Sequence, residues 1–278
     1  DVLFDLAKLL RGQRRLDEAL ACVDQALVVR PEFPKALSLR IELALKTGNF
    51  TDALATVNMA LTHRHDSADL YTQRGEIERA LGRPEAALKS FTRAIELKQD
   101  LAGALFGRAG VSLELGRYRD AIADLDRVIA QDPRLAAAHY NKGLALKATQ
   151  AKEALAVFDG LLSFAPDDLG GLYNRALILI TLGRYAEAVA SLKRLMELNP
   201  AYEDAAAQLL LARSYCCDWA DWDRDIAGAQ DAVAGGVLPM APFESVLLFD
   251  SPKLQQVCAV QYTARHFPAR KDGWSRSR

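Results

Sequence analysis

Hydrophobic and small residues recur along the first part of the chain with a period close to 34 residues. An alanine marks each copy, and successive marker alanines lie 34, 34, 34, 33 and 34 residues apart. An aliphatic or aromatic residue follows each marker after four positions, and alanine, valine or leucine after seven. Positions i, i+4 and i+7 share one face of an α-helix, so the pattern predicts an amphipathic helix in every copy. The markers are Ala19, Ala53, Ala87, Ala121, Ala154 and Ala188.

Another helix is predicted upstream of each marker, so each copy has a first helix and then a second helix that carries the marker. A mostly small residue lies twelve positions before the marker and lets two helices approach closely. A glycine five positions before it, replaced by Arg14 in the first copy, predicts a tight turn. The small column is Ala7, Ile41, Gly75, Ala109, Gly143 and Ala176, and the turn glycines are Gly48, Gly82, Gly116 and Gly183.

The end of each copy carries its own signal. Proline stands twelve positions after the marker in four copies, at Pro31, Pro133, Pro166 and Pro200. It is expected to end the second helix, because it has no N–H and clashes with the preceding turn. The fifth copy is one residue shorter and has no turn glycine, so its turn is expected around residues 147–151.

This arrangement resembles the tetratricopeptide repeat over residues 1–201, with six copies in register. The resemblance implies an all-α fold, a right-handed superhelical solenoid (an α-α superhelix) in which each hairpin packs mainly on its neighbours. It also implies that the first helices line a concave groove that binds extended peptides. Ile41 in the small column, and His65 and Gln99 in place of proline, depart from the pattern and bear on the tightness of the second and third repeats.

A polar column lies two positions before the small column. In the repeat arm of the protein O-GlcNAc transferases, asparagines here form a ladder, and each amide can pair with a peptide backbone through its donor and its acceptor. By similarity we expect peptide-binding roles for Asn141 and Asn174, and for Gln73. Leu39 and Gly107 interrupt the column. An exposed polar residue on a wet helix face is an equally simple interpretation, and the sequence leaves both open.

The next position along the chain is basic in five consecutive repeats. One interpretation is a cationic stripe that binds acidic peptide segments, with Arg40, Arg74, Arg108 and Arg175 as candidate peptide-binding residues. The other is that the stems pack between repeats while the heads pair with carboxylates such as Glu42, Glu76 or Glu114. The near-zero net charge favours the second. The whole column is Leu6, Arg40, Arg74, Arg108, Lys142 and Arg175.

After Pro200 the pattern changes. A helix is predicted over residues 201–215, then a Cys-Cys-Asp-Trp-Ala-Asp-Trp-Asp stretch at 216–223, a helix over 226–234 and a loop over 238–243. A last helix should start near Ser251-Pro252 and run to about His266, with the serine as its cap and the proline at its first position.

The Cys-Asp-Trp-x-Asp-Trp stretch is similar to the segment that joins repeats to catalytic domain in bacterial SPINDLY-type protein O-GlcNAc transferases. The similarity extends from Cys217 to Arg270 and includes the proline-containing loop Leu238–Phe243, Tyr262 and Phe267-Pro268. In that family, a pair of Rossmann-like domains that bind a UDP-sugar follows this segment. The resemblance implies that the chain, which opens at Asp1 without a methionine, is a piece of a longer protein.

The motif has two other interpretations. Two thiols beside two carboxylates suggest a metal, but the cysteines are adjacent, point to different sides of a helix and have no histidine nearby in sequence. We therefore expect no metal site. A capping device fits better: Trp219 and Trp222 would cover the open apolar end of the solenoid, while Asp218 or Asp221 caps a helix N-terminus.

Composition narrows the possible functions. Of 278 residues, 50% are hydrophobic and 26% charged, so disorder throughout is excluded. With 35 Lys and Arg against 36 Asp and Glu, the net charge gives no general attraction to nucleic acid or to an anionic membrane. No apolar run in the sequence is long enough to span a membrane. Four cysteines without CxxC spacing fit a reducing cytoplasm. No phosphate-binding, hydrolase or metalloprotease motif occurs, so we expect no catalytic residues and no cofactor.

The sequence therefore predicts six repeats over residues 1–201 and a partial seventh repeat with a helical linker or cap over 202–278. The leading hypothesis is a non-enzymatic interaction module, the acceptor-recognition arm of a glycosyltransferase resembling protein O-GlcNAc transferase. The alternative is a stand-alone scaffold that assembles protein complexes and has no enzymatic parent. Either would bind a polypeptide partner, with no nucleic acid and no membrane, and either could form a homodimer.

Overall fold

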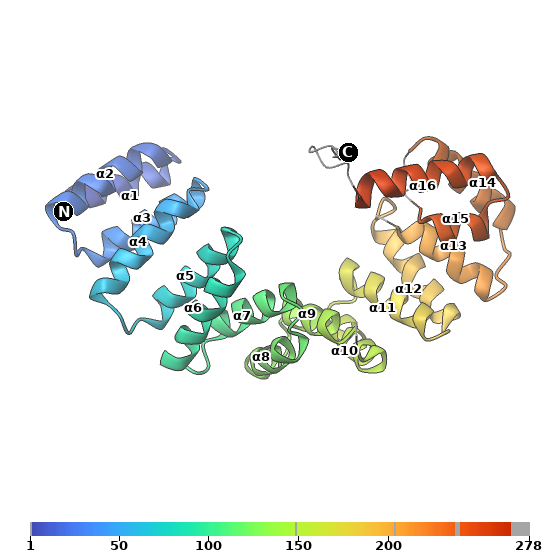
Figure 1. The fold of residues 1–278 in the computed structure, drawn as a ribbon, viewed down its shortest axis with the longest axis horizontal. Helices are drawn as coiled ribbons and strands as arrows, with labels where there is room; N and C mark the ends of the chain where they lie inside the picture. The colour runs from blue at the N-terminus through green and yellow to red at the C-terminus, as the bar shows by residue number, and fades with distance from the viewer. Residues whose placement is uncertain (1, 148, 203, 237–239, 268–278) are drawn as a thin grey trace, which may run out of the picture. The chain divides into compact units, whose positions relative to one another are not determined.

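The computed structural model describes residues 2–147, 149–202, 204–236 and 240–267, and these residues form helices and turns without a strand (Figure 1). The all-α expectation is confirmed. The helices are α1 (Val2–Gly12), α2 (Leu16–Val29), α3 (Pro34–Lys46), α4 (Phe50–His63), α5 (Ala68–Ala80), α6 (Pro84–Leu97), α7 (Ala102–Glu114), α8 (Tyr118–Gln131), α9 (Ala136–Lys147), α10 (Ala151–Phe164), α11 (Leu169–Thr181), α12 (Tyr185–Leu198), α13 (Ala205–Tyr215), α14 (Trp222–Ala234), α15 (Pro242–Leu248) and α16 (Pro252–His266).

The helices form two compact units, residues 1–145 and 146–278, whose division falls within α9. Within the units, the pairs α1–α2, α3–α4, α5–α6, α7–α8 and α11–α12 form predicted hairpins, and neighbouring hairpins pack on one another, as α2 packs on α3 and α10 on α11. This is the stacking of a tetratricopeptide solenoid. A boundary between repeats and cap at residue 201 stays a prediction.

Glycines make the turns within four hairpins, as their spacing predicts. Gly48, Gly82, Gly116 and Gly183 have φ angles of 74°, 68°, 70° and 72°, in the left-handed region where a Cβ is unfavourable. The chain changes direction directly after each of these glycines, between the two helices of the hairpin. After Gly48, for example, the Asn49 N–H donates back to the Ala44 carbonyl over 2.8 Å, which satisfies an open carbonyl at the end of α3.

Arg14 takes the same left-handed conformation in the first hairpin, with φ 60°, although it carries a Cβ. We expect Arg14→Gly to raise the free energy of unfolding by about 0.5–1 kcal/mol, because the strain disappears. Urea denaturation would measure the change. The matched control is Arg83→Gly, where φ is −112° and glycine only adds chain entropy. Equal losses of stability in the two variants would contradict the prediction.

The marker column forms the core. All six marker alanines have no exposed surface, and neither have the side chains four positions after them. The second helices end as predicted, since α2, α8, α10 and α12 each stop two residues before a proline. In the fifth repeat, α9 ends at Lys147 and α10 begins at Ala151. The shortened turn therefore lies where the one-residue deletion predicted it, around residues 147–151.

The C-terminal helices agree only in part with expectation. α16 begins at Pro252 with the Ser251 hydroxyl accepting from the Leu254 N–H over 3.4 Å, which confirms the predicted cap. The loop expected over 238–243 was too long, because Pro242 and Phe243 belong to α15. Leu238, Pro239 and the tail from Pro268 through Arg270 lie outside the described residues.

A small apolar core holds this C-terminal region together. Val233 of α14, Cys258 of α16, and Met240 and Phe249 at the two ends of α15 pack against Ala207 and Leu210 of α13. These side chains are nearly or fully buried. The helices after residue 221 therefore cover one side of α13, which is the first helix of the incomplete seventh repeat.

Candidate functional site

The basic column is Arg40, Arg74, Arg108, Lys142 and Arg175, and its charged groups are bound inside the repeats. Arg108 of α7 donates two hydrogen bonds of 2.7 Å to Asp124 of α8, and a longer one of 3.4 Å to Thr92 of α6. Asp124 is almost fully buried. Its hydrogen bonds raise the pKa of the Arg108 guanidinium above the usual value. One arginine thus ties a first helix to the second helices on both sides of it.

The same bridge recurs along the chain. For Arg40 and Arg175 the partners lie sixteen residues before and after the cation in sequence, one on each flanking helix, and for Lys142 the partner lies sixteen residues before it. The pairs are Arg40 with Asp24 (2.7 Å) and Thr56, Lys142 with Asp126 (2.6 Å), and Arg175 with Asp159 (2.6 Å) and Ser191 (2.6 Å). Arg74 differs, since it pairs over 3.0 Å with Glu78, whose other oxygen accepts from Ser90 over 2.6 Å.

The carboxylate partners named from the sequence were wrong. Glu42 binds Arg11 and Lys46 instead, and Glu114 binds Arg79. Glu42 lies two positions after Arg40 and is turned about 200° from it, and Glu114 lies six positions after Arg108 and is turned about 240°, so both glutamates face another side of the helix. The true partners also repeat with the 34-residue period, three and five positions after the markers, and that signal was present in the sequence. A peptide-binding role for the basic column stays a prediction.

The polar column is interrupted for a physical reason at Gly107. A Cβ placed there would lie 2.5 Å from two ring carbons of Phe91, and one placed at Gly75 would lie 2.8 Å from the same ring. Phe91 belongs to α6 and is fully buried between these glycines of α5 and α7. At Leu39, the column is buried and apolar.

The amide column comprises Gln73, Asn141 and Asn174, and its members have different surroundings. Asn174 is buried: its amide donates to the Gly170 carbonyl over 3.0 Å and accepts from Lys147 over 2.9 Å. Burial lowers the pKa of that lysine. Asn141 is half-buried, and its side chain makes no hydrogen bond with the described residues. The side-chain oxygen of Gln73 is buried without a hydrogen-bond partner there. Only Asn174 is therefore buried, while Gln73 and Asn141 are partly exposed, and a peptide-binding role for the column stays a prediction.

A hollow of about 460 Å³ lies on the first helices of the first unit. Lys8 and Arg11 of α1 and Lys35 of α3 line it, together with Arg64, while Glu42 is the one carboxylate among its described lining residues. Lys8 lies over the Phe4 ring at 5.4 Å, and Arg11 binds Glu42 at 2.7 Å. The hollow thus combines an aromatic wall with an excess of positive charge, which the search for a basic column missed.

The Cys-Asp-Trp stretch is organised by Arg213, a residue that sequence reasoning did not single out. The guanidinium of Arg213 is buried and binds Asp218 (3.1 Å), Asp225 and the carbonyl of Ala220. These bonds fold the segment between α13 and α14 around one cation. The motif's first aspartate therefore has a structural role, as a partner of this arginine.

The expected capping role of the tryptophans was only half right. Trp222 packs against the C-terminal core, but Trp219 is 54% exposed and touches Trp222 edge to face, with ring centroids 4.9 Å apart. Asp221 does precede α14, yet its side chain makes no capping hydrogen bond and pairs with Arg224 instead.

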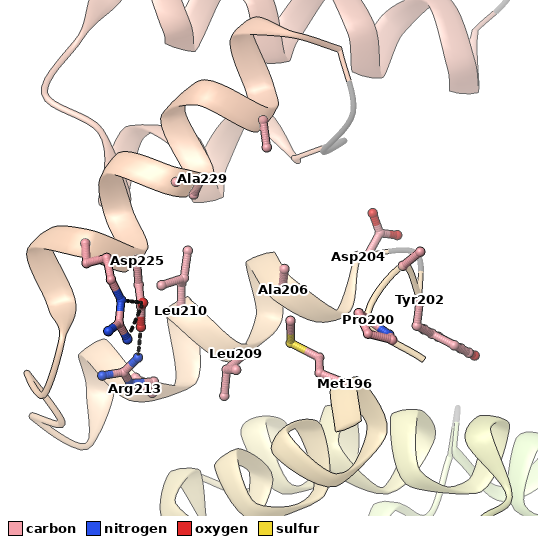
Figure 2. A pocket seen from close by; sticks show the side chains of 14 residues that line it. Met196, Pro200, Tyr202, Asp204, Ala206, Leu209, Leu210, Arg213, Asp225 and Ala229 are labelled. Carbon is pink, nitrogen blue, oxygen red and sulfur yellow. Dashed lines mark hydrogen bonds and ion pairs between the residues drawn. The ribbon is translucent and has the colours of Figure 1, made fainter. Parts of the chain in front are cut away.

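A larger cavity of about 780 Å³ lies between α13, α14 and the end of α12 (Figure 2). Apolar side chains form most of its wall, including Met196, Leu209 and Leu210. No group of His, Cys, Asp and Glu side chains within the described ranges is arranged to hold a metal ion. In that same part of the chain, no helix combines the length and apolar character that crossing a membrane requires.

Four family models match the chain, and all describe tetratricopeptide or TPR repeats. They match residues 4–69, 68–101, 111–150 and 142–213. A relative, the tetratricopeptide repeat and J domain-containing co-chaperone DNJ1 of Fusarium oxysporum f. sp. lycopersici, is 30% identical over 108 residues, which are 39% of this chain and 19% of that protein. The chain thus aligns with about a fifth of the relative's length.

Solved structures give the same fold. A tetratricopeptide repeat protein from Parabacteroides merdae matches 94% of this chain and 97% of its own at a TM-score of 0.65 and 16% identity. MamA from Desulfovibrio magneticus matches 61% and 96%, at a TM-score of 0.58 and 20% identity. YrrB, described as a TPR protein with an unusual peptide-binding site, matches 61% and 88%, at a TM-score of 0.54 and 26% identity.

The periodic core, the hairpins and these matches agree with one another over the repeats. Glycine turns, buried marker alanines and bridging arginines are each explained by hairpins that stack on their neighbours. The chain is a tetratricopeptide repeat protein.

Proposed function

We propose that the chain is a protein-interaction module whose first helices bind an extended peptide segment of a partner. The observation that carries the proposal is the state of Asn141, which is half-buried and whose amide makes no hydrogen bond with a described residue. The donor and the acceptor of this amide could therefore pair with the backbone of a bound peptide. YrrB, described as having an unusual peptide-binding site, supports the same function for a related fold.

The hollow on α1 and α3 indicates what such a peptide would carry. Lys35 and Arg64 are exposed at its edge, and neither forms an ion pair with a described residue. Carboxylates of the partner would meet these cations, while an apolar side chain could lie against Phe4. The basic column is less suited to this role, because its cations already bind Asp24, Asp124 and Asp159.

This proposal has two forms, which differ in whether the module belongs to a larger enzyme. In one, the module is a stand-alone scaffold, and the similarity to a co-chaperone's repeats supports it. In the other, it is the acceptor-recognition arm of a bacterial O-GlcNAc transferase-like enzyme, which rests on the Cys-Asp-Trp-x-Asp-Trp stretch. The coding sequence beyond Arg278 distinguishes them: a glycosyltransferase domain there supports the arm, and a stop codon excludes its simple form. A reducing cytoplasm suits either form, since all four cysteines are free thiols.

Asn141→Ala is expected to weaken peptide binding about thirtyfold, because one amide can make two hydrogen bonds to a peptide backbone, each worth about 1 kcal/mol. Fluorescent peptides of varied sequence would first be selected for binding to the wild-type protein. Their affinities would then be compared by anisotropy. Asn174→Ala should chiefly lower stability, since the buried amide already binds Gly170 and Lys147 and its loss leaves Lys147 without that partner.

The matched control is Gln256→Ala, which removes an exposed amide from α16. It should leave every selected peptide bound as tightly as before. Affinities unchanged by Asn141→Ala would remove the amide column from the proposal, and failure to select any peptide would overturn the proposed function itself.

A further inference from the structure

The cavity of about 780 Å³ in the second unit lies between α13 and α14, the two helices of the incomplete seventh repeat. In complete repeats the two helices pack along their length, but α14 leans away from α13 and leaves a wedge between them (Figure 2). Along α13, Ala206, Leu209, Leu210 and Arg213 line the wedge, at spacings i, i+3, i+4 and i+7. Along α14, Asp225, Gly228, Ala229 and Ala232 do so at the same spacings. One face of each helix therefore lines the same cavity.

Charged side chains lie at both ends of this wedge. At the closed end, Arg213 and Asp225 bind each other and hold the two helices together. At the open end lies Asp204, which is half-buried and whose carboxylate makes no hydrogen bond or ion pair with a described residue. Burial raises the pKa of this carboxyl, and His266 opposes the shift only in part. A carboxylate in such a place is stabilised by a cation from outside.

The surroundings add to this negative charge. α14 and the turn before it expose Asp221, Asp223 and Asp231, against Arg224 as the exposed cation. The wall is mostly apolar and includes the small residues Ala206, Gly228, Ala229 and Ala232, so the backbone of another helix could approach it closely there. Its volume lies within the range of about 300–1,000 Å³ that ligand pockets have.

We propose that this wedge is a second binding site, separate from the concave groove, and that it takes an amphipathic helix of a partner protein with an apolar stripe and a flanking lysine or arginine. The apolar stripe would pack against Leu209, Leu210 and Met196, and the cation would pair with Asp204. The lined face of α13 extends about 10 Å from Ala206 to Arg213, which accommodates two helical turns. Helices commonly bind such grooves through residues spaced i, i+3, i+4 and i+7.

The site is independent of the amide column. The seventh-repeat residue in that column is Gln208, which faces away from the wedge and donates to Glu244 of α15 over 2.6 Å. Variants of Asn141 should therefore leave the wedge unaffected, and the two proposals can fail separately.

The test uses a synthetic peptide of about four helical turns, with leucine along one face and lysine along the other, whose binding to the full chain is measured by calorimetry. Gly228→Phe should lower its affinity at least tenfold, because a Cβ at Gly228 meets nothing within 4 Å and the new ring would occupy the wedge. Asp204→Asn should lower it several-fold. The matched controls are Gly160→Phe, on a helical glycine of α10 with equally open space, and Asp250→Asn, on an exposed carboxylate.

Two control peptides separate the proposed occupant from others. The same peptide with glutamate in place of lysine should bind much more weakly, and so should a scrambled peptide of identical composition. Equal binding to wild type and Gly228→Phe, or equal binding of the scrambled peptide, would overturn the site.

Residues 268–278 carry Trp274 and four cations. If a chain ending at Phe267 binds the peptide much more tightly than the full chain, that tail is the occupant and a partner helix is excluded.

Discussion

Replacing Arg213 with methionine is expected to unfold the C-terminal helices at denaturant concentrations that leave the repeats folded. The Arg213 side chain is 7% exposed, and it binds two carboxylates and a carbonyl. Removing one partner of a buried ion pair costs about 3–5 kcal/mol, because the other charge stays buried without compensation. Asp218 and Asp225 keep 29% and 28% of their side-chain surface exposed, so we expect a loss near the lower limit, about 3 kcal/mol.

The distribution of tryptophan makes this loss easy to locate. All three tryptophans, Trp219, Trp222 and Trp274, follow Arg213 in the chain. Their fluorescence therefore reports on the C-terminal region, while circular dichroism reports on all the helices. In the variant, the fluorescence transition in urea should move to lower concentration and separate from the main dichroism transition.

Arg224→Met is the matched control for this experiment. Arg224 also contacts Asp225, at 3.4 Å, but its side chain is 73% exposed, and such surface pairs contribute about 0–1 kcal/mol. The control should leave both transitions where they are. If Arg213→Met and Arg224→Met shift the fluorescence transition equally, Arg213 does not organise the segment between α13 and α14.

The repeats could be predicted from the sequence because each hairpin meets nearly the same neighbours. A position such as the marker alanine has the same environment in all six copies. Because it is buried in the same way each time, the same residue type recurs at the same spacing. The bridges of the basic column follow the same logic. Asp24, Asp126 and Asp159 occupy one column, and that column would have identified the partners of Arg40, Lys142 and Arg175.

The features that could not be predicted occur once in the chain. Arg213 binds Asp218 and Asp225 across a turn that no other repeat contains, so no periodic pattern points to it. The opening between α13 and α14 depends on how α14 packs against α16, a contact between segments with no repeated spacing. From the sequence, Leu39 and Gly107 are interruptions of the polar column. Only the packing shows that Leu39 is buried and that Gly107 makes room for the Phe91 ring.

Gly107→Ala is expected to destabilise the first unit by about 2–3 kcal/mol, as overpacking of a filled core does. The new methyl group would lie 2.5 Å from ring carbons of Phe91. The ring has no exposed surface, and Gly75 confines it on the other side, so it cannot retreat. Urea denaturation followed by circular dichroism would measure the loss.

Gly103→Ala, four residues earlier in α7, is the matched control. The nearest atom to its new Cβ is a methyl carbon of Thr72 at 3.8 Å, an ordinary contact. This variant should gain up to about 1 kcal/mol, because alanine is the better helix former. Stabilisation by both substitutions would show that Phe91 does not fill the space at Gly107.

A double-mutant cycle tests the cause of the Gly107→Ala loss. In a Phe91→Leu background the ring is gone, so Gly107→Ala should cost about 1–2 kcal/mol less than in the wild-type chain, which is a coupling typical of residues in contact. Additive losses would assign the destabilisation to the backbone of α7. If the coupling is found, an asparagine can complete the amide column at position 107 only in a chain that has also lost the Phe91 ring. The interruption of that column is then a consequence of how α5, α6 and α7 pack.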